Sequence, residues 1–206
     1  MGIRMPHAER RRQLVEAAIR VMTRDGVART TTRAVVAEAG VSLSVFHYCF
    51  TSKQELLEAV MEAISEHSES RVLATLSRQM VLQETVRGTI RAGLQAYWDH
   101  VLAHRGEHLL TYELTQYALR EPGYEHLAQR QYERYVEAHA KVIRRLGALL
   151  PGAELVAPAT TAARYLAALT DGLTLNFLVL GDEEKAGEVL DTVADQILAL
   201  LAPAEG

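Results

Sequence analysis

Residues Thr30–Leu57 read TTTRAVVAEAGVSLSVFHYCFTSKQELL. Two short helical segments flank Gly40-Val41-Ser42, where the glycine permits a tight turn and Val41 can fill the space between the two helices. The threonines before the first segment and Ser42 before the second are residues that cap helix N-termini. This stretch therefore predicts a helix-turn-helix.

The two segments can close a small core with the helix that precedes them. That helix has one apolar stripe and ends at Gly26. The side chains expected in this core are Leu14, Ala18, Val21, Val35, Val36, Val45 and Phe46. The opposite face of the second segment then stays exposed, as it must be to enter a DNA major groove about 12 Å wide.

The charge of the chain is distributed unevenly. Residues 1–53 hold nine Lys or Arg and four Asp or Glu, whereas the remaining residues hold 13 basic and 22 acidic groups. A basic head on an acidic body suggests that only the head meets a polyanion, although chance clustering of surface charge would look the same.

In the rest of the chain the apolar residues recur at the helical period of 3.6 residues. No segment shows the sustained alternation of apolar and polar residues that is typical of a strand. We expect an all-α protein of about nine helices, in which a three-helix head is joined to a C-terminal bundle. The predicted domains are residues 1–53, for DNA binding, and residues 54–206, for ligand binding and dimerisation.

Neither a signal peptide nor an apolar run of the roughly 18 residues that a membrane span needs is visible. Cys49 is the only cysteine, so no intrachain disulfide can form. These features predict a cytoplasmic protein that does not contact a membrane.

The head resembles the TetR family of repressors. The resemblance rests on about 50 residues: Ala17-Ala18 and the Gly26 stop, Thr30-Thr31-Thr32-Arg33, Ala39-Gly40-Val41-Ser42, Phe46-His47-Tyr48, and Phe50-Thr51-Ser52-Lys53 followed by Glu55-Leu56-Leu57. Near the C-terminus, Ala168-Leu169-Thr170-Asp171-Gly172-Leu173 resembles the BetI-like class of TetR ligand domains. The sequence departs from the family pattern at His47, where a tyrosine is usual, and at Cys49, where an aromatic residue or a histidine is usual.

The resemblance implies roles for individual residues. Those expected at the DNA are Thr31, Thr32, Arg33, Ser42, Leu43, Ser44, His47, Tyr48 and Lys53. The effector candidates are the aromatic and polar residues Trp98, Tyr112, Glu113, Gln116, Tyr117, Asn176 and Phe177. The dimer interface is expected at the apolar positions Leu166, Leu169, Leu173, Val193 and Ile197.

The sequence thus predicts a homodimeric repressor that a small organic effector releases from a palindromic double-stranded operator. Two alternatives stay open: a DNA-binding regulator whose body docks a protein, and a helical enzyme with a vestigial head.

No catalytic motif stands out, and no cofactor is expected. His100, His104 and His108 have metal-ligand spacing, but Gly106 should break their shared face, so no metal site is expected. A redox role for Cys49 is a further open alternative.

Overall fold

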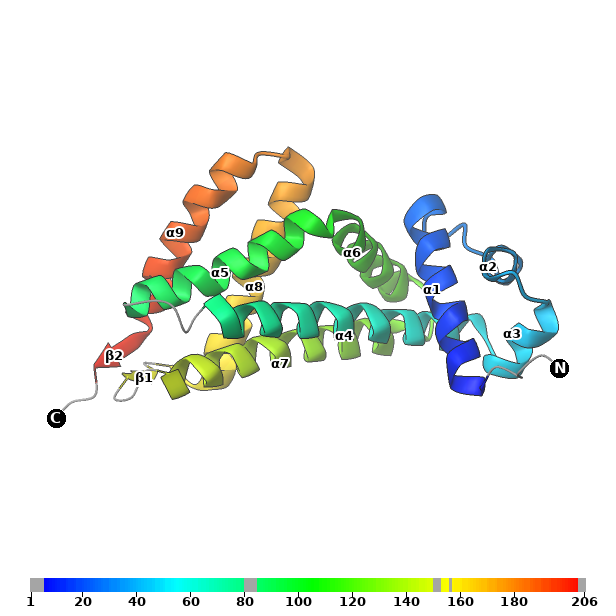
Figure 1. Cartoon of the computed structure of the whole chain (residues 1–206), viewed down its shortest axis with the longest axis horizontal. Helices are drawn as coiled ribbons and strands as arrows, with labels where there is room; N and C mark the ends of the chain where they lie inside the picture. Colours follow the sequence, from blue (N-terminus) through cyan, green and yellow to red (C-terminus); the bar gives the residue numbers. More distant parts are fainter. Residues whose placement is uncertain (1–5, 80–84, 150–152, 156, 204–206) are drawn as a thin grey trace. The chain divides into compact units, whose positions relative to one another are not determined.

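The structure is a computed structural model that describes residues 6–79, 85–149, 153–155 and 157–203. Within these ranges the chain forms nine helices, which Figure 1 labels. They are α1 (His7–Asp25), α2 (Thr32–Ala39), α3 (Leu43–Cys49), α4 (Lys53–Gln79), α5 (Val86–Ala103), α6 (Arg105–Arg120), α7 (Glu125–Leu149), α8 (Ala159–Leu180) and α9 (Glu183–Ala199).

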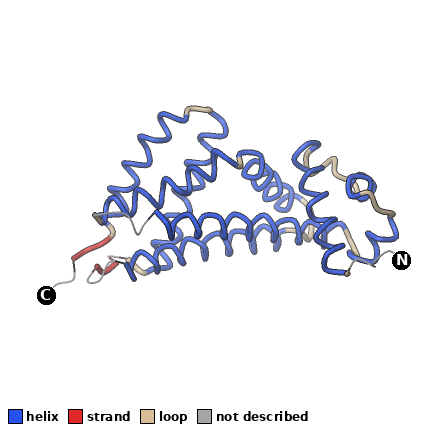
Figure 2. Tube along the Cα trace, in the orientation of Figure 1, coloured by secondary structure: helices blue, strands red, loops and turns tan. Residues whose placement is uncertain are grey.

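Two three-residue strands complete the described elements. β1 (Ala153–Leu155) pairs antiparallel with β2 (Leu201–Pro203), and Leu155 lies opposite Leu201. Figure 2 shows helix along nearly all of the described trace, which confirms the all-α class that the sequence predicts. None of the described helices is both long and apolar enough to span a membrane.

Several helices begin or end at residues that satisfy their free backbone groups. Thr31 caps α2 through its Oγ1, which accepts a hydrogen bond from the backbone N–H of Ala34 at 3.1 Å. Asp182 caps α9 in the same way, accepting from the N–H of Lys185 at 3.0 Å. Gly40 ends α2 in the left-handed conformation, with φ at +66°, which a glycine adopts without strain.

The chain divides into two compact units. Unit 1 contains the described residues up to Glu66 together with Gly106–Gln131, and unit 2 contains His67–Arg105 and the described residues from Tyr132 onward. Unit 1 therefore includes α6 and the first turns of α7 in addition to the predicted head. Compactness is a different criterion from function, so the domain boundary after Lys53 stays a prediction.

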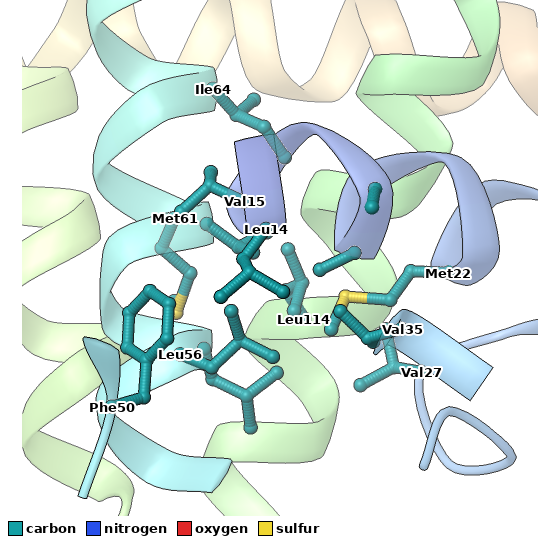
Figure 3. Close-up of a cluster of buried hydrophobic side chains, with 14 of the residues drawn as sticks. Leu14, Val15, Met22, Val27, Val35, Phe50, Leu56, Met61, Ile64 and Leu114 are labelled. Carbon is teal, nitrogen blue, oxygen red and sulfur yellow. The ribbon is translucent and has the colours of Figure 1, made fainter. Parts of the chain in front are cut away.

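The core of unit 1 joins the helix-turn-helix to α1, α4 and α6. Leu14 of α1, Val35 of α2 and Leu56 of α4 are buried, and Leu114 of α6 lies among them (Figure 3). Phe46 of α3 is 1% exposed. Burying large apolar side chains of this kind stabilises a fold by roughly 1.5–3 kcal/mol each, so this core holds α3 in place.

Unit 2 has a separate core, built by α5, α7, α8 and α9. Trp98 of α5 meets Phe177 of α8 edge-on, with ring centroids 4.8 Å apart, and Leu190 of α9 is fully buried. On the surface, Arg87 pairs with Asp195 at 2.6 Å and so links α5 to α9. Because this pair is exposed, we expect most of the stability of unit 2 to come from its apolar core.

Candidate functional site

The recognition helix α3 has one buried face and one exposed face. Phe46 and Cys49 point into the core of unit 1. The four predicted DNA-contact residues of this helix are all exposed: Leu43, Ser44, His47 and Tyr48. This division follows from the helical period, and it leaves a polar and aromatic face free for a base edge or a phosphate.

The remaining predicted contacts lie near the helix starts of the head. Thr31 and Arg33, at the N-terminus of α2, are exposed, and Thr32 is half-buried. Ser42 is exposed at the N-cap of α3, where its Oγ lies 2.7 Å from the Oγ of Ser44. The first turn of α2 presents backbone N–H groups and hydroxyls, the combination that binds phosphate.

Lys53, the first residue of α4, is half-buried. Its Nζ lies 5.3 Å from the centroid of the Tyr117 ring on α6. Burial lowers the pKa of Lys53, and the nearby Glu121 opposes that shift. Tyr117 was an effector candidate, so the structure places one of those candidates under a predicted DNA contact within unit 1.

Arg11 of α1 joins the C-terminal end of α3 to the start of α4, a contact that the sequence analysis did not predict. Its Nη1 donates to the carbonyl oxygen of Cys49 at 2.8 Å and to Glu55 Oε1 at 2.6 Å. The guanidinium lies 4.1 Å from the ring centroid of Phe50. The Ser52-x-x-Glu55 spacing, a capping-box pattern, is the signal that could have identified the acceptor.

Glu55 also receives hydrogen bonds from Thr51. Its Oε2 accepts from the backbone N–H and from the hydroxyl of Thr51, both at 2.8 Å. The Thr51 backbone hydrogen bond, followed by that from Arg11, lowers the pKa of Glu55 to about 2. The carboxylate is therefore ionised at neutral pH and fixes the corner between α3 and α4.

We expect Glu55→Gln to destabilise unit 1 in a pH-dependent way. The folded pKa lies below the ordinary value of 4.5, so the ionised carboxylate stabilises the fold above about pH 4.5. This contribution is lost as the pH falls toward the folded value of about 2. At neutral pH the substitution should cost about 1 kcal/mol, a charged hydrogen bond discounted for partial exposure.

Urea unfolding followed by circular dichroism checks this expectation. The difference in unfolding free energy between wild type and variant should be smaller at about pH 3 than at neutral pH. An equal difference at both pH values would contradict the role given to the charge of Glu55.

The seven effector candidates lie in both units. Tyr112, Glu113, Gln116 and Tyr117 are on α6 in unit 1, and Trp98, Asn176 and Phe177 are in unit 2. Trp98 and Phe177 are buried against each other, whereas Gln116 and Asn176 are exposed. Glu113 has a partner in the head, because its Oε1 accepts a hydrogen bond from the backbone N–H of Val27 at 2.7 Å.

Unit 2 contains a polar and aromatic cluster that the sequence analysis did not assemble. The Tyr97 hydroxyl lies 2.5 Å from Thr174 Oγ1, and the Tyr135 hydroxyl lies 2.8 Å from Thr170 Oγ1. Burial raises the pKa of both tyrosines, so both hydroxyls keep their protons at neutral pH. The signal was the helical spacing of Thr170 with Thr174 and of Tyr135 with His139.

His139 completes this cluster as a neutral imidazole. Burial lowers its pKa. Its Nδ1 lies 2.8 Å from the carbonyl oxygen of Tyr135 and must donate there, because a carbonyl only accepts. In the neutral ring Nε2 is then an acceptor and lies 2.9 Å from Thr170 Oγ1, whose one hydroxyl proton is also directed to the carbonyl oxygens of Leu166 and Ala167.

A carboxylate lies at the edge of the cluster. Asp171 Oδ2 accepts from the hydroxyl of Tyr132 at 2.9 Å, and Asp171 is half-buried. Together with Tyr97, Tyr135 and His139, these residues combine aromatic faces, hydrogen-bonding groups and one negative charge. This combination suits a flat molecule that carries a positive charge.

The five predicted interface residues pack on the core of unit 2. Leu166 and Val193 are buried in it, and Leu169, Leu173 and Ile197 are half-buried against it. A different stripe of α8 is exposed and follows the 4-3-4-3-4 spacing of a helix-packing seam. Its members are Thr161, Tyr165, Ala168, Gly172, Leu175 and Val179.

The surroundings of Cys49 and of the three histidines give no support to a sensing role in the residues that the structure describes. Cys49 is buried, and burial raises the pKa of its thiol. The rings of His100 and His104 stack with centroids 4.4 Å apart, while His108 belongs to unit 1. In the part of the chain that the structure describes, no three His, Cys, Asp or Glu side chains form a group that could hold a metal ion.

Comparisons with known proteins agree with this architecture. Residues 14–60 match the model of bacterial regulatory proteins of the tetR family. Residues 86–202 match the C-terminal domain of BetI-type transcriptional repressors. The second match alone covers more than half of the chain.

Named relatives extend over almost the full length. The nicotine-responsive transcriptional repressor HdnoR of Paenarthrobacter nicotinovorans is 27% identical over 95% of this chain and 97% of its own. The transcriptional regulator BetI of Burkholderia mallei is 28% identical over 94% of each chain.

Solved structures show the same fold. The multidrug binding protein EbrR, complexed with ethidium, is 30% identical with a TM-score of 0.64, over 88% of this chain and 96% of that one. Both family models and both named relatives are transcriptional regulators, which sets the enzyme alternative aside. The chain therefore belongs to the tetR family of bacterial regulatory proteins, and is a helix-turn-helix transcriptional repressor with a BetI-type C-terminal domain.

Proposed function

We propose that this repressor binds a palindromic operator as a homodimer in the cytoplasm, and that an aromatic organic cation releases it. The observation that carries the effector class is the unit 2 cluster, in which Tyr97, Tyr132, Tyr135 and His139 accompany the carboxylate of Asp171. A cation beside an acid and aromatic faces gains electrostatic stabilisation that a neutral compound lacks.

On the DNA, each protomer places α3 in a major groove and the first turn of α2 against a phosphate. Arg33 is exposed beside this turn and can reach a guanine edge or a phosphate. Lys53 adds positive charge near the backbone. Two heads related by a twofold axis read half-sites about 34–36 Å apart, which is why the operator should be a palindrome.

The exposed seam of α8 is the proposed dimer interface. Ala168 and Gly172 are small residues one turn apart, and the position of a Cβ on Gly172 has no neighbouring atom within 4 Å. A partner helix can therefore approach closely there. The Tyr165 hydroxyl donates to Gln196 Oε1 of α9 at 3.0 Å, so both helices contribute to one face. This arrangement supports a four-helix bundle between two copies.

The names of two relatives support the effector class. HdnoR is described as nicotine-responsive, and EbrR is described in complex with ethidium. Nicotine combines a basic amine with an aromatic ring, and ethidium is a flat aromatic cation. A ligand can release DNA only if it binds the DNA-free state more tightly than the DNA-bound state.

Ethidium and nicotine test this proposal in separate assays. Ethidium is titrated without DNA, because it intercalates, and its binding is read from its own fluorescence and from that of Trp98, the only tryptophan. Nicotine and related aromatic amines are titrated against the operator complex. We expect saturable ethidium binding, a higher melting temperature and operator release by at least one amine.

Asp171→Asn isolates the charge. It should weaken ethidium binding by roughly 10-fold or more, because the ligand loses its counter-charge, and it should leave operator affinity unchanged. The matched control is Asp99→Asn, an exposed carboxylate on α5. If Asp171→Asn binds ethidium like wild type, or if no cation binds at all, the effector proposal is wrong and a protein partner becomes the better reading.

A further inference from the structure

We propose that Glu113 of α6 is a positioning residue for operator binding, which holds the turn between α1 and α2 and so fixes the phosphate-facing end of α2. This inference rests on the proposed DNA contacts of Thr31 and Thr32. The observation is the 2.7 Å hydrogen bond from the backbone N–H of Val27 to Glu113 Oε1, across 86 positions of sequence.

The turn has other hydrogen bonds, but they are local. The N–H of Thr30 donates to the carbonyl oxygen of Val27 at 3.2 Å. The hydroxyl of Thr30 donates to the carbonyl oxygen of Gly26 at 2.8 Å. The Arg29 guanidinium donates to the carbonyl oxygen of Asp25 at 2.5 Å. These bonds shape the turn, whereas the bond to Glu113 ties it to another helix.

The burial of Val27 makes this link consequential. Val27 is fully buried, although its acceptor Glu113 is an exposed residue. When the Glu113 carboxylate is removed, the N–H of Val27 must either open to water or stay unpaired, and either outcome loosens the turn. The acceptor is a carboxylate, which gives a stronger bond than a neutral oxygen would. A substitution that removes the Glu113 carboxylate should therefore loosen the turn, and not merely leave the N–H of Val27 unpaired.

Gly26 permits the close approach of the carboxylate. Its φ of +87° lies in the region that favours glycine, and a Cβ at this position would lie 3.1 Å from Glu113 Oε1. The glycine that ends α1 therefore also makes room for the acceptor. From sequence alone it is visible only as a helix stop.

Other side chains of α6 also contact the head. Leu110 and Leu114 are buried in the core of unit 1 with Leu14 and Val35, and Figure 3 shows Leu114 among the side chains of the head. Tyr117, one turn beyond Glu113, lies under the ammonium of Lys53. Helix α6 thus contacts two elements that carry predicted DNA contacts.

The position of this turn should determine where α2 meets the DNA backbone. Val27 precedes the N-cap Thr31 by four residues, so the position of the turn sets where the first turn of α2 begins. Phosphate contacts fix the orientation of a recognition helix on the duplex. Loosening the turn should therefore weaken the specific complex, which needs α2 and α3 placed together, more than non-specific binding.

The experiment compares Glu113→Ala with Glu113→Gln, whose amide oxygen can still accept from Val27. Affinity is measured for a selected operator and for a random duplex, alongside thermal melting and hydrogen exchange of residues 27–32. Glu113→Ala should lose operator affinity on the order of 10-fold, change random-duplex affinity far less, and speed exchange at Val27. Glu113→Gln should stay within about 3-fold of wild type.

The control is Glu125→Ala, an exposed carboxylate in the same unit, which should match wild type. The inference is overturned if Glu113→Ala, still folded, binds the operator like wild type, or if both Glu113 variants lose specific and random binding in parallel with their melting temperatures. If wild type itself prefers no operator, the proposed DNA contacts fail. In that case the rate of hydrogen exchange at the Val27 amide still tests the link to Glu113, because an unchanged rate in Glu113→Ala would refute that link.

Discussion

Leu175→Glu should convert the dimer into monomers and lower operator affinity by at least about 100-fold, because each protomer would bring an unpaired carboxylate to a twofold interface. Leu175 lies in the exposed seam of α8 and is 46% exposed in the single chain. The substitution should therefore leave the protomer folded. A monomer can occupy only one half-site, so affinity for the full operator falls with the loss of the dimer.

Light scattering and operator titration measure the two effects together. Leu119→Glu on α6 is the matched control, because Leu119 is a leucine of similar exposure, 55%, outside the seam. It should remain dimeric and bind normally. A dimeric Leu175→Glu variant would refute the proposed interface, and the half-buried residues Leu169 and Leu173 would regain interest as its location.

Phe46→Ala should destabilise unit 1 by roughly 3–5 kcal/mol, the usual cost of emptying a fully buried aromatic site. The centroid of the Phe46 ring lies 5.6 Å from that of Phe50, and both side chains belong to the core of unit 1. Losing it removes the support behind the DNA-contacting face. Operator binding should fail under conditions in which unit 2 is still folded.

Two optical signals can separate the units in this experiment. Trp98 lies in unit 2, so its fluorescence follows the unfolding of that unit, whereas circular dichroism follows all helices. Phe46→Ala should shift the dichroism transition to lower urea and leave the fluorescence transition close to wild type. Leu43→Ala, on the exposed face of the same helix, should shift neither transition. A Phe46→Ala variant as stable as wild type would contradict the role of this core.

The sequence predicted the faces of the helix-turn-helix because they depend only on local spacing. In α3 the sequence analysis placed Phe46 in the core and His47 and Tyr48 on the opposite face, and the structure buries the first and exposes the other two. The burial of Cys49 was not predicted. The caps at Thr31 and Gly40 are equally local signals. The nine-helix class followed from the same periodicity, applied to longer segments.

Partners far apart in the sequence could not be predicted in this way. Spacing rules reach about four residues along a helix, whereas Arg11 meets Glu55 and Glu113 meets Val27 across most of a domain. Residue type also does not distinguish a core aromatic from one in a binding site. Trp98 was chosen as an effector candidate for its type, and in the structure it packs on Phe177.

The prediction of a dimer face shows a related limit of the sequence analysis. The sequence analysis selected the most apolar stripe of α8 and α9, including Leu166 and Val193, and these side chains fill the core of the protomer itself. The exposed stripe is more mixed and contains Ala168 and Gly172. Hydrophobicity alone favours the stripe with Leu166 and Val193 as an interface, because it does not reveal which face of a helix is already buried within the protomer.

The central claim is sequence-specific DNA binding by the basic head, and one titration tests it most directly. A duplex selected from genomic fragments and a scrambled duplex of equal length are titrated with the protein over a range of salt concentrations. The account predicts that the selected duplex binds roughly 1,000-fold more tightly or better, and that its affinity falls steeply with salt, by about 0.9 log units per phosphate contact per log of salt. Equal affinity for both duplexes, with little dependence on salt, would contradict it.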